Sequence, residues 1–535
     1  MDSSFLSAVK AIERDAKIIY ENDPNQLREM AKPDETTTEF KSASYITIIR
    51  SRSAKFTEIV FEPKKEHIET IAKVTEFLKD KEMIVIDRVM CMKKEYKTNI
   101  RLFVTRRFAR LAFMWGEMLF PVSSFRFPER KETGKLVSAD TWFSPGSKVS
   151  GPGKKKSDFT IIDVPEWPER KILVDPNSFT TFILGSDYCG EIKKAGLRMM
   201  MYFHKTKRNG LGLHAGSKVL RVRGIDGKIL EKGVLLFGLS ATGKTTLTCH
   251  HHWLDTSEGE GVVIRQDDVV LLNKDSSAIG TEDNFYIKTD GLEPDSQPLL
   301  YKGAISPNAI LENVKVDEKT RKVDFFDSSI TSNGRGVVIR KELDFTDNSI
   351  DLDKVDMIVF ITRRKTIVPP IAKLTSEQAA AFFMLGESVE SSAGDPTQAG
   401  KPLKVVGTNP FIIGPFEEEG NRFLEILKLN PHIECYLLDT GYFGARENAK
   451  GMKITVYDSA RLLADAARGT LVWKKDPDWG YEVATSAEDV DLGVFDPSVF
   501  YSEDEYRRLT KELKDERRAW LRQFKGLDKK IANAI

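Results

Sequence analysis

The chain has 535 residues, which is too long for one hydrophobic core and predicts two or three domains. Its 81 lysines and arginines nearly balance its 80 aspartates and glutamates, and a formal net charge of +1 gives no reason to expect a nucleic-acid partner. The four cysteines lie far apart and form no C-x-x-C pair, so the sequence favours neither a disulfide framework nor a zinc knuckle.

No apolar run approaches the roughly 18 residues that a membrane helix needs, so we expect no membrane partner. The first residues lead into a charged helical pattern rather than the apolar core of a signal peptide. We therefore expect a cytoplasmic protein. The sequence indicates no oligomeric state.

The N-terminal part of the chain alternates helical and strand-like patterns. Residues 2–31 have helical spacing, and Pro24 is expected to divide them into two helices. Further helices are expected at 66–79 and 106–118, and strands at 45–49, 58–61, 83–87, 100–104, 159–164 and 179–184. This alternation predicts the α/β fold class.

Two segments between these elements have loop composition. The basic run at 50–55, which contains Arg52, is on its own typical of a solvated turn. Residues 134–156 are rich in glycine, serine, lysine and proline, and we expect an exposed loop there.

The most informative stretch follows a predicted strand at 234–237. It has the sequence Gly-Leu-Ser-Ala-Thr-Gly-Lys-Thr over residues 238–245 and matches the phosphate-binding pattern G-x-x-x-x-G-K-[S/T] at every fixed position. In this pattern backbone N–H groups surround the phosphates, the lysine reaches the outer phosphates, and the final hydroxyl holds the divalent ion. The sequence therefore predicts nucleoside triphosphate binding. The alternative is a glycine-containing turn that matches by chance.

A second polar cluster follows the next predicted strand, at 261–265. This strand ends on Gln266, Asp267 and Asp268, and acids placed after a strand downstream of a phosphate loop are typical of metal-binding carboxylates. The alternative is an acidic turn. The C-terminal part then predicts strands at 355–361 and 435–438 and helices from 375 and over 502–525.

Other polar residues are ambiguous on the residues alone. Lys193 and Lys194 begin a mostly apolar helix, and their spacing favours two surface lysines. His214 follows a short strand pattern, where a satisfied core histidine is the usual interpretation. Three consecutive histidines at 250–252 favour a surface loop, because adjacent side chains diverge.

Taken together, these groups predict a metal-rich phosphate site. Thr245 and Asp267 are candidates for the ion on the triphosphate, and His214 and Asp268 for a second ion. Lys244 is then placed to neutralise the phosphoryl group in transfer, together with Arg335.

The order and spacing of these segments resemble the active-site series of the ATP-dependent phosphoenolpyruvate carboxykinase family, over nearly the whole chain. That series comprises residues 190–194 (Gly-Glu-Ile-Lys-Lys), His214, 238–246, Asp267, Asp268 and Arg335. Weaker similarities extend it: 52–55 resembles the family's substrate loop, 368–375 its Pro-Pro segment, 453–461 its nucleotide-base strand and 495–497 its tail.

The resemblance implies an α/β, two-lobed phosphoenolpyruvate carboxykinase-like fold with mixed sheets. An N-terminal lobe over 1–212 is expected to bind oxaloacetate or phosphoenolpyruvate, and a C-terminal lobe over 213–535 to bind the mononucleotide through its P-loop and metal site. The implied reaction converts oxaloacetate and ATP to phosphoenolpyruvate, CO2 and ADP. The implied cofactors are Mn2+ and Mg2+, the latter as Mg-ATP, and the partners are small molecules only.

Residue roles follow from the matched positions. The implied metal residues are Lys194, His214 and Asp268 for Mn2+, with Thr245 and Asp267 on the magnesium–nucleotide. The implied catalytic residues are Lys193, Lys194, Lys244 and Arg335, and the substrate-binding residues are Arg52, Tyr188, Lys194 and Arg335. The implied nucleotide-binding residues are Gly238, Leu239, Ser240, Ala241, Thr242, Gly243, Lys244, Thr245, Thr246, Lys453 and Ser459.

Several positions depart from the family pattern. Ala241 and Gln266 stand where glycine is usual, Lys453 replaces a base-stacking arginine, and 391–401 lacks the usual lid signature. The alternatives are a divergent kinase on the same scaffold and a nucleotide-binding regulator. Retained Arg52 and Tyr188 favour the carboxykinase over a kinase, because a hydroxyl acceptor needs no dicarboxylate clamp. The retained metal and phosphate residues argue against the regulator.

Overall fold

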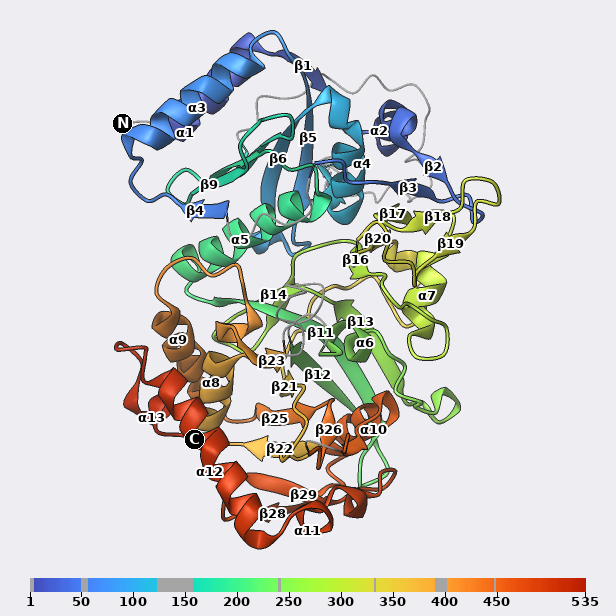
Figure 1. The fold of residues 1–535 in the computed structure, drawn as a ribbon, viewed down its shortest axis with the longest axis vertical. Coiled ribbons are helices and arrows are strands. Elements are labelled where there is room, and N and C mark those ends of the chain that lie inside the picture. The colour runs from blue at the N-terminus through green and yellow to red at the C-terminus, as the bar shows by residue number, and fades with distance from the viewer. Residues whose placement is uncertain are drawn as a thin grey trace, which may run out of the picture. The chain divides into compact units, whose positions relative to one another are not determined.

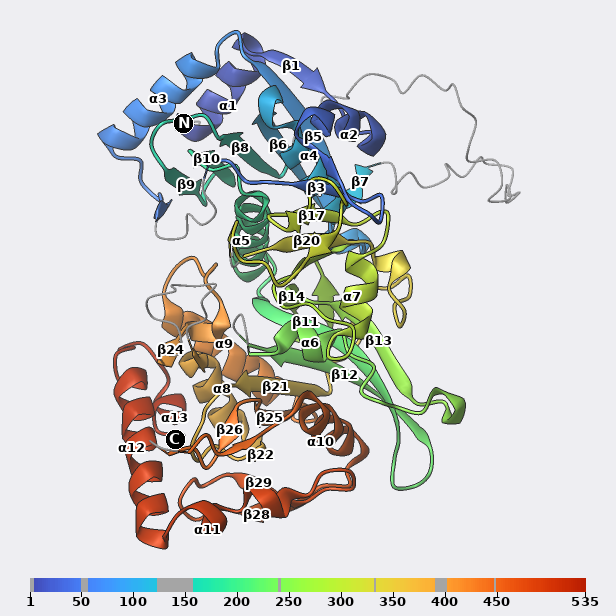
Figure 2. The same ribbon diagram turned by 45° about the vertical axis from the view of Figure 1, so that its right-hand side comes forward.

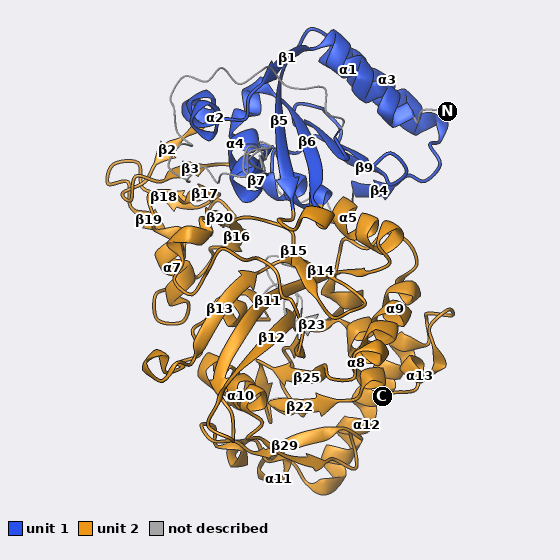
Figure 3. Ribbon diagram, turned by 180° about the vertical axis from the view of Figure 1, so that it is seen from behind, with its two compact units in different colours: residues 1–33, 48–90, 97–196 blue, residues 34–47, 91–96, 197–535 orange. Residues whose placement is uncertain are grey.

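The computed structural model describes residues 4–49, 56–122, 157–238, 242–331, 333–389, 402–446 and 449–535 (Figure 1). These residues form two compact units (Figure 3). The first unit comprises 1–33, 48–90 and 97–196, and the second comprises 34–47, 91–96 and 197–535. The chain passes from one to the other within helix α5 (Cys189–Lys207). The loops expected at 50–55 and 134–156 lie outside the described residues, as do Leu239, Ser240 and Ala241.

The first unit is built on a mixed eight-stranded sheet with the order β1-β5-β6-β8-β10-β9-β4, in which β7 also pairs with β5. Its strands are β1 (Lys17–Tyr20), β4 (Thr57–Ile59), β5 (Glu82–Met90), β6 (Thr98–Thr105), β7 (Phe120–Pro121), β8 (Phe159–Val164), β9 (Lys171–Asp175) and β10 (Thr180–Leu184).

Helices cover both faces of this sheet. Met83 and Val85 of β5 join the core beneath α1 (Ser4–Asp15) and α3 (Lys65–Leu78). Ile86, one position out of phase, faces Gly116 of α4 (Ala109–Met118), which packs on α2 (Pro24–Ala31). Because successive side chains of a strand point to opposite faces, a strand covered on both sides is buried along its whole length, as β8 is.

The prediction of two helices within residues 2–31 is correct, but their extent is wrong. Helix α1 ends at Asp15, and Lys17–Tyr20 pairs parallel with β5, with Lys17 opposite Glu82. Pro24 opens α2 rather than breaking a longer helix, and the Asp23 side chain accepts from the backbone N–H of Asn25. The two isoleucines of β1 gain a partner strand that their local spacing does not indicate.

The second unit contains a ten-stranded mixed sheet with the order β15-β14-β11-β12-β21-β25-β22-β29-β28, in which β13 also pairs with β11. Its strands are β11 (Leu211–Arg223), β12 (Ile229–Phe237), β13 (Gly261–Gln266), β14 (Val269–Leu272), β15 (Ala278–Gly280), β21 (Met357–Thr362), β22 (Ile371–Leu374), β25 (Glu434–Asp439), β28 (Val472–Lys475) and β29 (Glu482–Ser486).

Two cores fill the opposite faces of this sheet (Figures 1 and 2). On one face, Leu235 and Phe237 of β12 join the core formed with α8 (Ser376–Leu385), α9 (Phe416–Leu429), α12 (Glu503–Leu521) and α13 (Lys529–Ala532). On the other face, Val234 and Leu236 pack with α6 (Lys244–Thr248) and α10 (Val456–Arg468).

A smaller sheet completes the second unit, with the order β16-β20-β17-β3-β2. Its strands are β16 (Phe285–Lys288), β20 (Arg335–Val338), β17 (Ile310–Glu312), β3 (Ala43–Tyr45) and β2 (Thr36–Thr37), and helix α7 (Pro298–Ala304) packs on β20. Two-stranded ribbons are formed by β18 (Lys315–Val316) with β19 (Val323–Asp324), β23 (Glu387–Val389) with β24 (Pro402–Lys404), and β26 (Tyr442–Phe443) with β27 (Met452–Lys453). Pro497–Phe500 forms the short helix α11.

The described elements confirm a mixed α/β fold with several mixed sheets. The helix expected from 375 is α8, where the Thr375 hydroxyl accepts from the Gln378 N–H and the Gln378 side chain accepts from the Thr375 N–H. The strand expected at 45–49 is wrong in its position, because β3 covers Ala43–Tyr45 and shares only Tyr45 with that range. Across the described ranges, no helix combines the length and apolar character needed to cross a bilayer.

A buried ion pair fastens α12 to the start of β23. The Glu387 carboxylate accepts from Arg517 at 2.9 and 2.8 Å and from Arg364 at 2.9 Å. Burial raises the pKa of Glu387, but the two guanidinium groups outweigh burial and bring that pKa to about 2. The carboxylate is therefore charged in the folded protein, and each partner relies on the others for solvation.

We expect Glu387→Gln to lower the free energy of unfolding by about 3–5 kcal/mol, because it leaves the fully buried Arg517 guanidinium without its carboxylate, whereas Arg364 keeps Glu516 at 3.2 Å. Urea unfolding at neutral pH measures this loss. Since the folded pKa lies below the ordinary value of 4.5, the stabilisation is complete above about pH 4.5 and lost as the pH falls towards 2. The difference between wild type and variant should shrink over that interval.

The exposed pair Arg508–Glu512 on the same helix α12 is the matched control. We expect Glu512→Gln to change stability by less than about 0.5 kcal/mol, because solvent screens exposed pairs. Equal losses in the two variants would contradict the assigned weight of the buried pair.

Candidate functional site

Three parallel strands of the second unit end at one edge of the sheet. Strands β12, β21 and β25 run parallel, and their carboxyl ends are followed by Gly238, by 363–370 and by Thr440. The Thr440 hydroxyl donates to the Thr242 carbonyl at 2.7 Å and also contacts the Thr362 carbonyl. This edge is where open α/β sheets bind their ligands, because loops from neighbouring strands converge there.

The glycine motif lies at this edge, between β12 and α6. Gly243 precedes α6 with a φ of 95°, a conformation that favours glycine. A Cβ on Gly238 would lie 2.4 Å from the Thr242 hydroxyl, so that position has no room for a side chain. The strand and helix predicted on either side of the motif are confirmed, while its central three residues lie outside the described ranges.

Lys244, His214 and Asp268 meet beside this motif. The Lys244 ammonium lies 3.1 Å from His214 Nε2 and 3.5 Å from Asp268 Oδ1, and the last two atoms are 2.9 Å apart. Strand pairing explains the meeting, because His214 of β11 lies opposite Val269, the residue after Asp268. The register between β11 and β14 thus helps to bring together three residues that lie 24 to 54 positions apart in sequence.

The protonation of His214 follows from its other nitrogen. Nδ1 contacts the Thr408 carbonyl, which can only accept, so Nδ1 carries the proton and Nε2 offers a lone pair. That lone pair faces a carboxylate oxygen, and two acceptors at 2.9 Å need a cation beside them. The ammonium of Lys244 supplies positive charge here, and a divalent ion is chemically suited to the same imidazole and carboxylate.

Burial and the Lys244 ammonium both lower the pKa of His214, while Asp268 and the Thr408 carbonyl oppose them. The net direction keeps the imidazole neutral, which is the form that binds a metal ion. The interpretation of His214 as an ordinary satisfied core histidine is therefore insufficient, because its Nε2 faces Asp268 and Lys244. Thr408 was not predicted, because its contribution is a backbone carbonyl from a distant segment.

The remaining predicted residues of the second unit lie on three elements. Asp267 is buried between β13 and β14, and the Gln266 amide beside it donates to the Glu282 carbonyl and accepts from the Glu282 N–H. A glycine could not make these bonds, which explains this departure from the family pattern. The Thr246 hydroxyl, on α6, donates to Gln297 Oε1 at 3.2 Å. Arg335 starts β20.

Arg335 is held from both sides. Its guanidinium donates to Asn333 Oδ1 at 2.8 Å and lies 5.8 Å from the Tyr286 ring centre. At the positions predicted to bind the nucleotide base, Lys453 of β27 is exposed, whereas Ser459 of α10 is buried and donates to the Thr455 carbonyl at 3.0 Å.

In the first unit, Tyr188, Lys193 and Lys194 lie at the start of α5. The Lys194 ammonium contacts Glu191 Oε1 at 2.9 Å and lies 5.4 Å from the Tyr188 ring centre. A Cβ on Gly190 would lie 2.5 Å from that ring, so glycine is required there. Lys193 is only 5% exposed, and the prediction of two surface lysines is wrong for it.

Asp187 ties the approach to the 50–55 segment to Tyr188. Its carboxylate accepts from the N–H groups of Ile48 and Ile49 at 2.8 Å each and pairs with the fully buried Arg110. Arg52 itself lies outside the described residues. Lys194 belongs to the first unit and His214 to the second, so a shared ion remains a prediction.

One other group of metal-ligand types occurs among the described residues: Glu58, Glu66 and His67. His67 Nδ1 accepts from the Lys64 N–H at 3.1 Å, so the ring proton lies on Nε2, which faces Glu58 at 3.0 Å. A ring that donates through Nε2 has no lone pair for an ion there. This group caps α3 and is explained without a metal.

The surface loop expected for residues 250–252 is wrong for two of the three histidines. His250 and His252 are buried. Their burial is tolerated because His250 Nδ1 accepts from the His252 N–H and His252 Nδ1 contacts the Ala460 carbonyl. Backbone partners leave no sequence pattern, so hydrophobicity alone could not indicate this burial.

Comparison with known proteins was informative. A family model described as phosphoenolpyruvate carboxykinase matches residues 52–492, which include every site residue predicted above. The phosphoenolpyruvate carboxykinase (ATP) of Aeropyrum pernix is 40% identical over 370 residues, 69% of this chain and 72% of that protein. The glycosomal phosphoenolpyruvate carboxykinase (ATP) of Trypanosoma brucei brucei is 28% identical over 429 residues, 79% of this chain and 81% of that protein.

The contact of Lys244 with His214 predicts the direction of two pKa changes. Lys244→Met removes a cation that disfavours the imidazolium, so the pKa of His214 should rise. Asp268→Asn removes a carboxylate that favours it, so that pKa should fall further. NMR titration of histidine C–H resonances in metal-free protein measures both.

His204 is the internal control, because burial lowers its pKa to about 4 and its ring contacts the Leu272 carbonyl instead. Its titration should not move in either variant. An unmoved His214 titration in Lys244→Met would show that the three groups do not meet in solution.

Proposed function

The chain belongs to the phosphoenolpyruvate carboxykinase family, and we propose that it converts oxaloacetate and ATP to phosphoenolpyruvate, CO2 and ADP. The observation that carries this proposal is the meeting of His214 and Asp268 at the lysine of the phosphate-binding motif. Loss of CO2 from oxaloacetate leaves an enolate whose oxygen takes the γ-phosphoryl group, so positive charge is needed both at the transferring phosphate and at the developing enolate. These three side chains bring the two requirements to one place.

The nucleotide is proposed to bind at residues 238–246, as a P-loop in a C-terminal mononucleotide-binding lobe over 213–535. Lys244 would contact the outer phosphates, and Thr245 and Asp267 would hold the magnesium ion of Mg-ATP. Lys453 and Ser459 are proposed to face the base. Support comes from the left-handed Gly243 and the crowded Gly238, since both belong to a tight turn whose N–H groups approach an anion.

A second ion, proposed as Mn2+, fits the donor set of His214, Asp268 and Lys194. The imidazole is already directed by the Thr408 carbonyl, which is the usual support for a metal-binding histidine. Lys194 would bind the ion through the lone pair of its amine, as a neutral ligand. When bound, the ion would supply positive charge where the enolate develops.

Oxaloacetate is proposed to bind in an N-terminal lobe over 1–212, with Arg52, Tyr188 and Arg335 on its carboxylates and on CO2. The Asp187 carboxylate supports this role for Arg52, because it fixes Ile49 beside Tyr188. Arg335 is oriented by Asn333, as a bidentate contact requires. We propose that the protein works on small molecules in the cytoplasm.

The direct test is to incubate the purified protein with oxaloacetate, ATP, Mn2+ and Mg2+ and to measure phosphoenolpyruvate. The proposal expects phosphoenolpyruvate formation that requires all four. ATP binding without phosphoenolpyruvate formation would refute it and would favour a divergent kinase on the same scaffold.

Two groups of variants separate the metal site from the nucleotide site. We expect Lys194→Ala and His214→Ala to lower turnover by about 10²–10³-fold or more, as loss of preorganised positive charge does, while ATP affinity stays nearly intact. Lys244→Ala should lower ATP affinity itself. Isothermal titration with Mg-ATP and the phosphoenolpyruvate assay measure the two effects.

His432→Ala is the matched control, because His432 is exposed and distant in sequence from every proposed site residue. It should leave both measurements unchanged. A loss of ATP affinity in Lys194→Ala as large as that in Lys244→Ala would contradict the assigned roles.

A further inference from the structure

A fully buried lysine lies under the phosphate-motif helix. Lys218 of β11 is 0% exposed, and no carboxylate within the described ranges forms an ion pair with it. Its ammonium instead donates to the Leu247 carbonyl of α6 at 2.5 Å and contacts His252 Nε2. Burying an ammonium without a counter-ion is unfavourable, and burial lowers the pKa of Lys218 to about 7.

His252 is oriented to receive this lysine. Its Nδ1 contacts the Ala460 carbonyl of α10 at 2.9 Å, so Nδ1 carries the proton and Nε2 is the acceptor that the ammonium needs. The His252 N–H in turn donates to His250 Nδ1 at 2.9 Å. The lysine therefore has one acceptor on α6 and a second that is fixed to α10.

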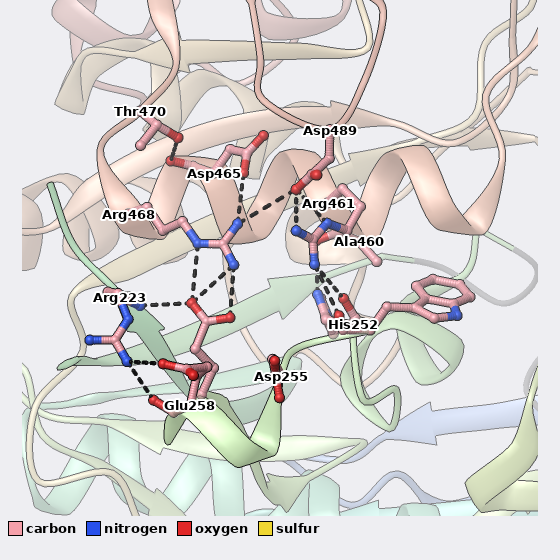
Figure 4. A network of polar contacts seen from close by, with 12 residues as sticks. Arg223, His252, Asp255, Glu258, Ala460, Arg461, Asp465, Arg468, Thr470 and Asp489 are labelled. Carbon is pink, nitrogen blue, oxygen red and sulfur yellow. Dashed lines mark hydrogen bonds and ion pairs between the residues drawn. The ribbon is translucent and has the colours of Figure 1, made fainter. Parts of the chain in front are cut away.

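The segment around His252 is itself fastened to α10 (Figure 4). Arg461 of α10 donates to the Trp253 carbonyl at 3.1 Å and pairs with Asp489. About two turns further along α10, Arg468 pairs with Glu260 at 3.0 Å and with Asp465 at 3.0 Å. Residues 252–260 and α10 are thus held together at several points along the helix.

Helix α6 also has little freedom against β11. A Cβ on Gly216 would lie 2.1 Å from the Thr248 hydroxyl, so the strand and the last turn of α6 touch. The lysine two residues further along β11 bonds to Leu247 in that same turn. Because α6 is only five residues long, a shift of its last turn moves Lys244 and Thr245 at its start.

We propose that Lys218 and His252 are positioning residues for nucleotide binding, and that this buried pair locks the phosphate-motif helix α6 to the base-side helix α10. The inference rests on the proposed function, in which α6 carries Lys244 and Thr245 and α10 carries Ser459. The Lys218–His252 pair thus connects α6, which is proposed to bind the phosphates, to α10, which is proposed to bind the base of the same nucleotide. An apolar residue at 218 would pack equally well but would remove the ammonium that joins the Leu247 carbonyl to His252, leaving that carbonyl its longer contact of 3.1 Å with His252 Nε2.

The test compares Lys218→Met, His252→Phe and the double variant. Each protein is measured for the affinity of Mg-ADP by isothermal titration, for KM and kcat, and for its melting temperature. We expect both single variants to bind Mg-ADP about tenfold more weakly and to raise the KM for ATP, with a smaller change in the KM for oxaloacetate. Both should also melt earlier, because each leaves a buried polar group unpaired.

The double variant separates positioning from stability. Replacing both partners leaves no buried ammonium or imidazole without its partner, although the Leu247 and Ala460 carbonyls lose their side-chain contacts, so the melting temperature should recover in part. Affinity for Mg-ADP should not recover, because the apolar packing that α6 and α10 still share lacks the directional hydrogen bonds of the Lys218–His252 pair. If affinity recovers together with the melting temperature, or if the single variants bind Mg-ADP as wild type does, the pair is merely structural and the proposal is overturned.

Lys205→Met is the matched control. Lys205 of α5 is also largely buried in the second unit, but it pairs with Glu419 at 2.6 Å and donates to the Ile413 carbonyl. This variant should lose stability and keep its Mg-ADP affinity. Wild-type protein that binds Mg-ADP but forms no phosphoenolpyruvate would refute the proposed reaction while leaving the Lys218 comparison valid, so the two failures are distinguishable.

Discussion

The pairing register of β11 is the constraint on which the second unit depends. Residues 214, 216 and 218 share the face of this strand that lies under α6. His214 faces Asp268, Gly216 leaves space for the Thr248 side chain, and Lys218 donates to the Leu247 carbonyl. Pairing with β14 sets His214 opposite Val269, and pairing with β13 sets Ser217 opposite Gln266. A slip by one residue would turn all three side chains to the opposite core, so a single register aligns imidazole, helix and carboxylates at once.

Electrostatics explain why positive charge concentrates at this edge of the sheet. A neutral imidazole and a carboxylate present lone pairs to the same point, while a lysine from the glycine motif approaches it. Such an arrangement is unfavourable without a cation and favourable with one, which suits a site where charge must be supplied as a reaction proceeds. The first unit shows a related pattern, since buried Lys193 adjoins a lysine that pairs with Glu191.

Much of this could be predicted from sequence, because the signals are local. The glycine motif, the strand before it and the acids after β13 are contiguous patterns whose physics is set within a few residues. Thr408, Lys218 and His252 could not be predicted in their roles, because each acts through a backbone carbonyl that meets a side chain distant in sequence. The same holds for β1, where the local spacing predicts a helix but pairing with the distant strand β5 produces a strand. Resemblance to a family supplied the order of the site residues, but not these supports.

The membership of residues 34–47 in the second unit has a consequence for how the polypeptide matures. Strand β3 pairs with β17, and the Thr47 N–H donates to Asn313 Oδ1, 266 positions later. During synthesis this early stretch leaves the ribosome long before its partner exists, and closing so large a loop is entropically slow. A polypeptide cut near residue 212 would leave β2 and β3 on the N-terminal fragment, separated from their partner strand β17. The second unit can therefore complete its smaller sheet only after both residues 34–47 and β17 have been synthesised. A truncated form designed to contain the second unit must also include residues 34–47.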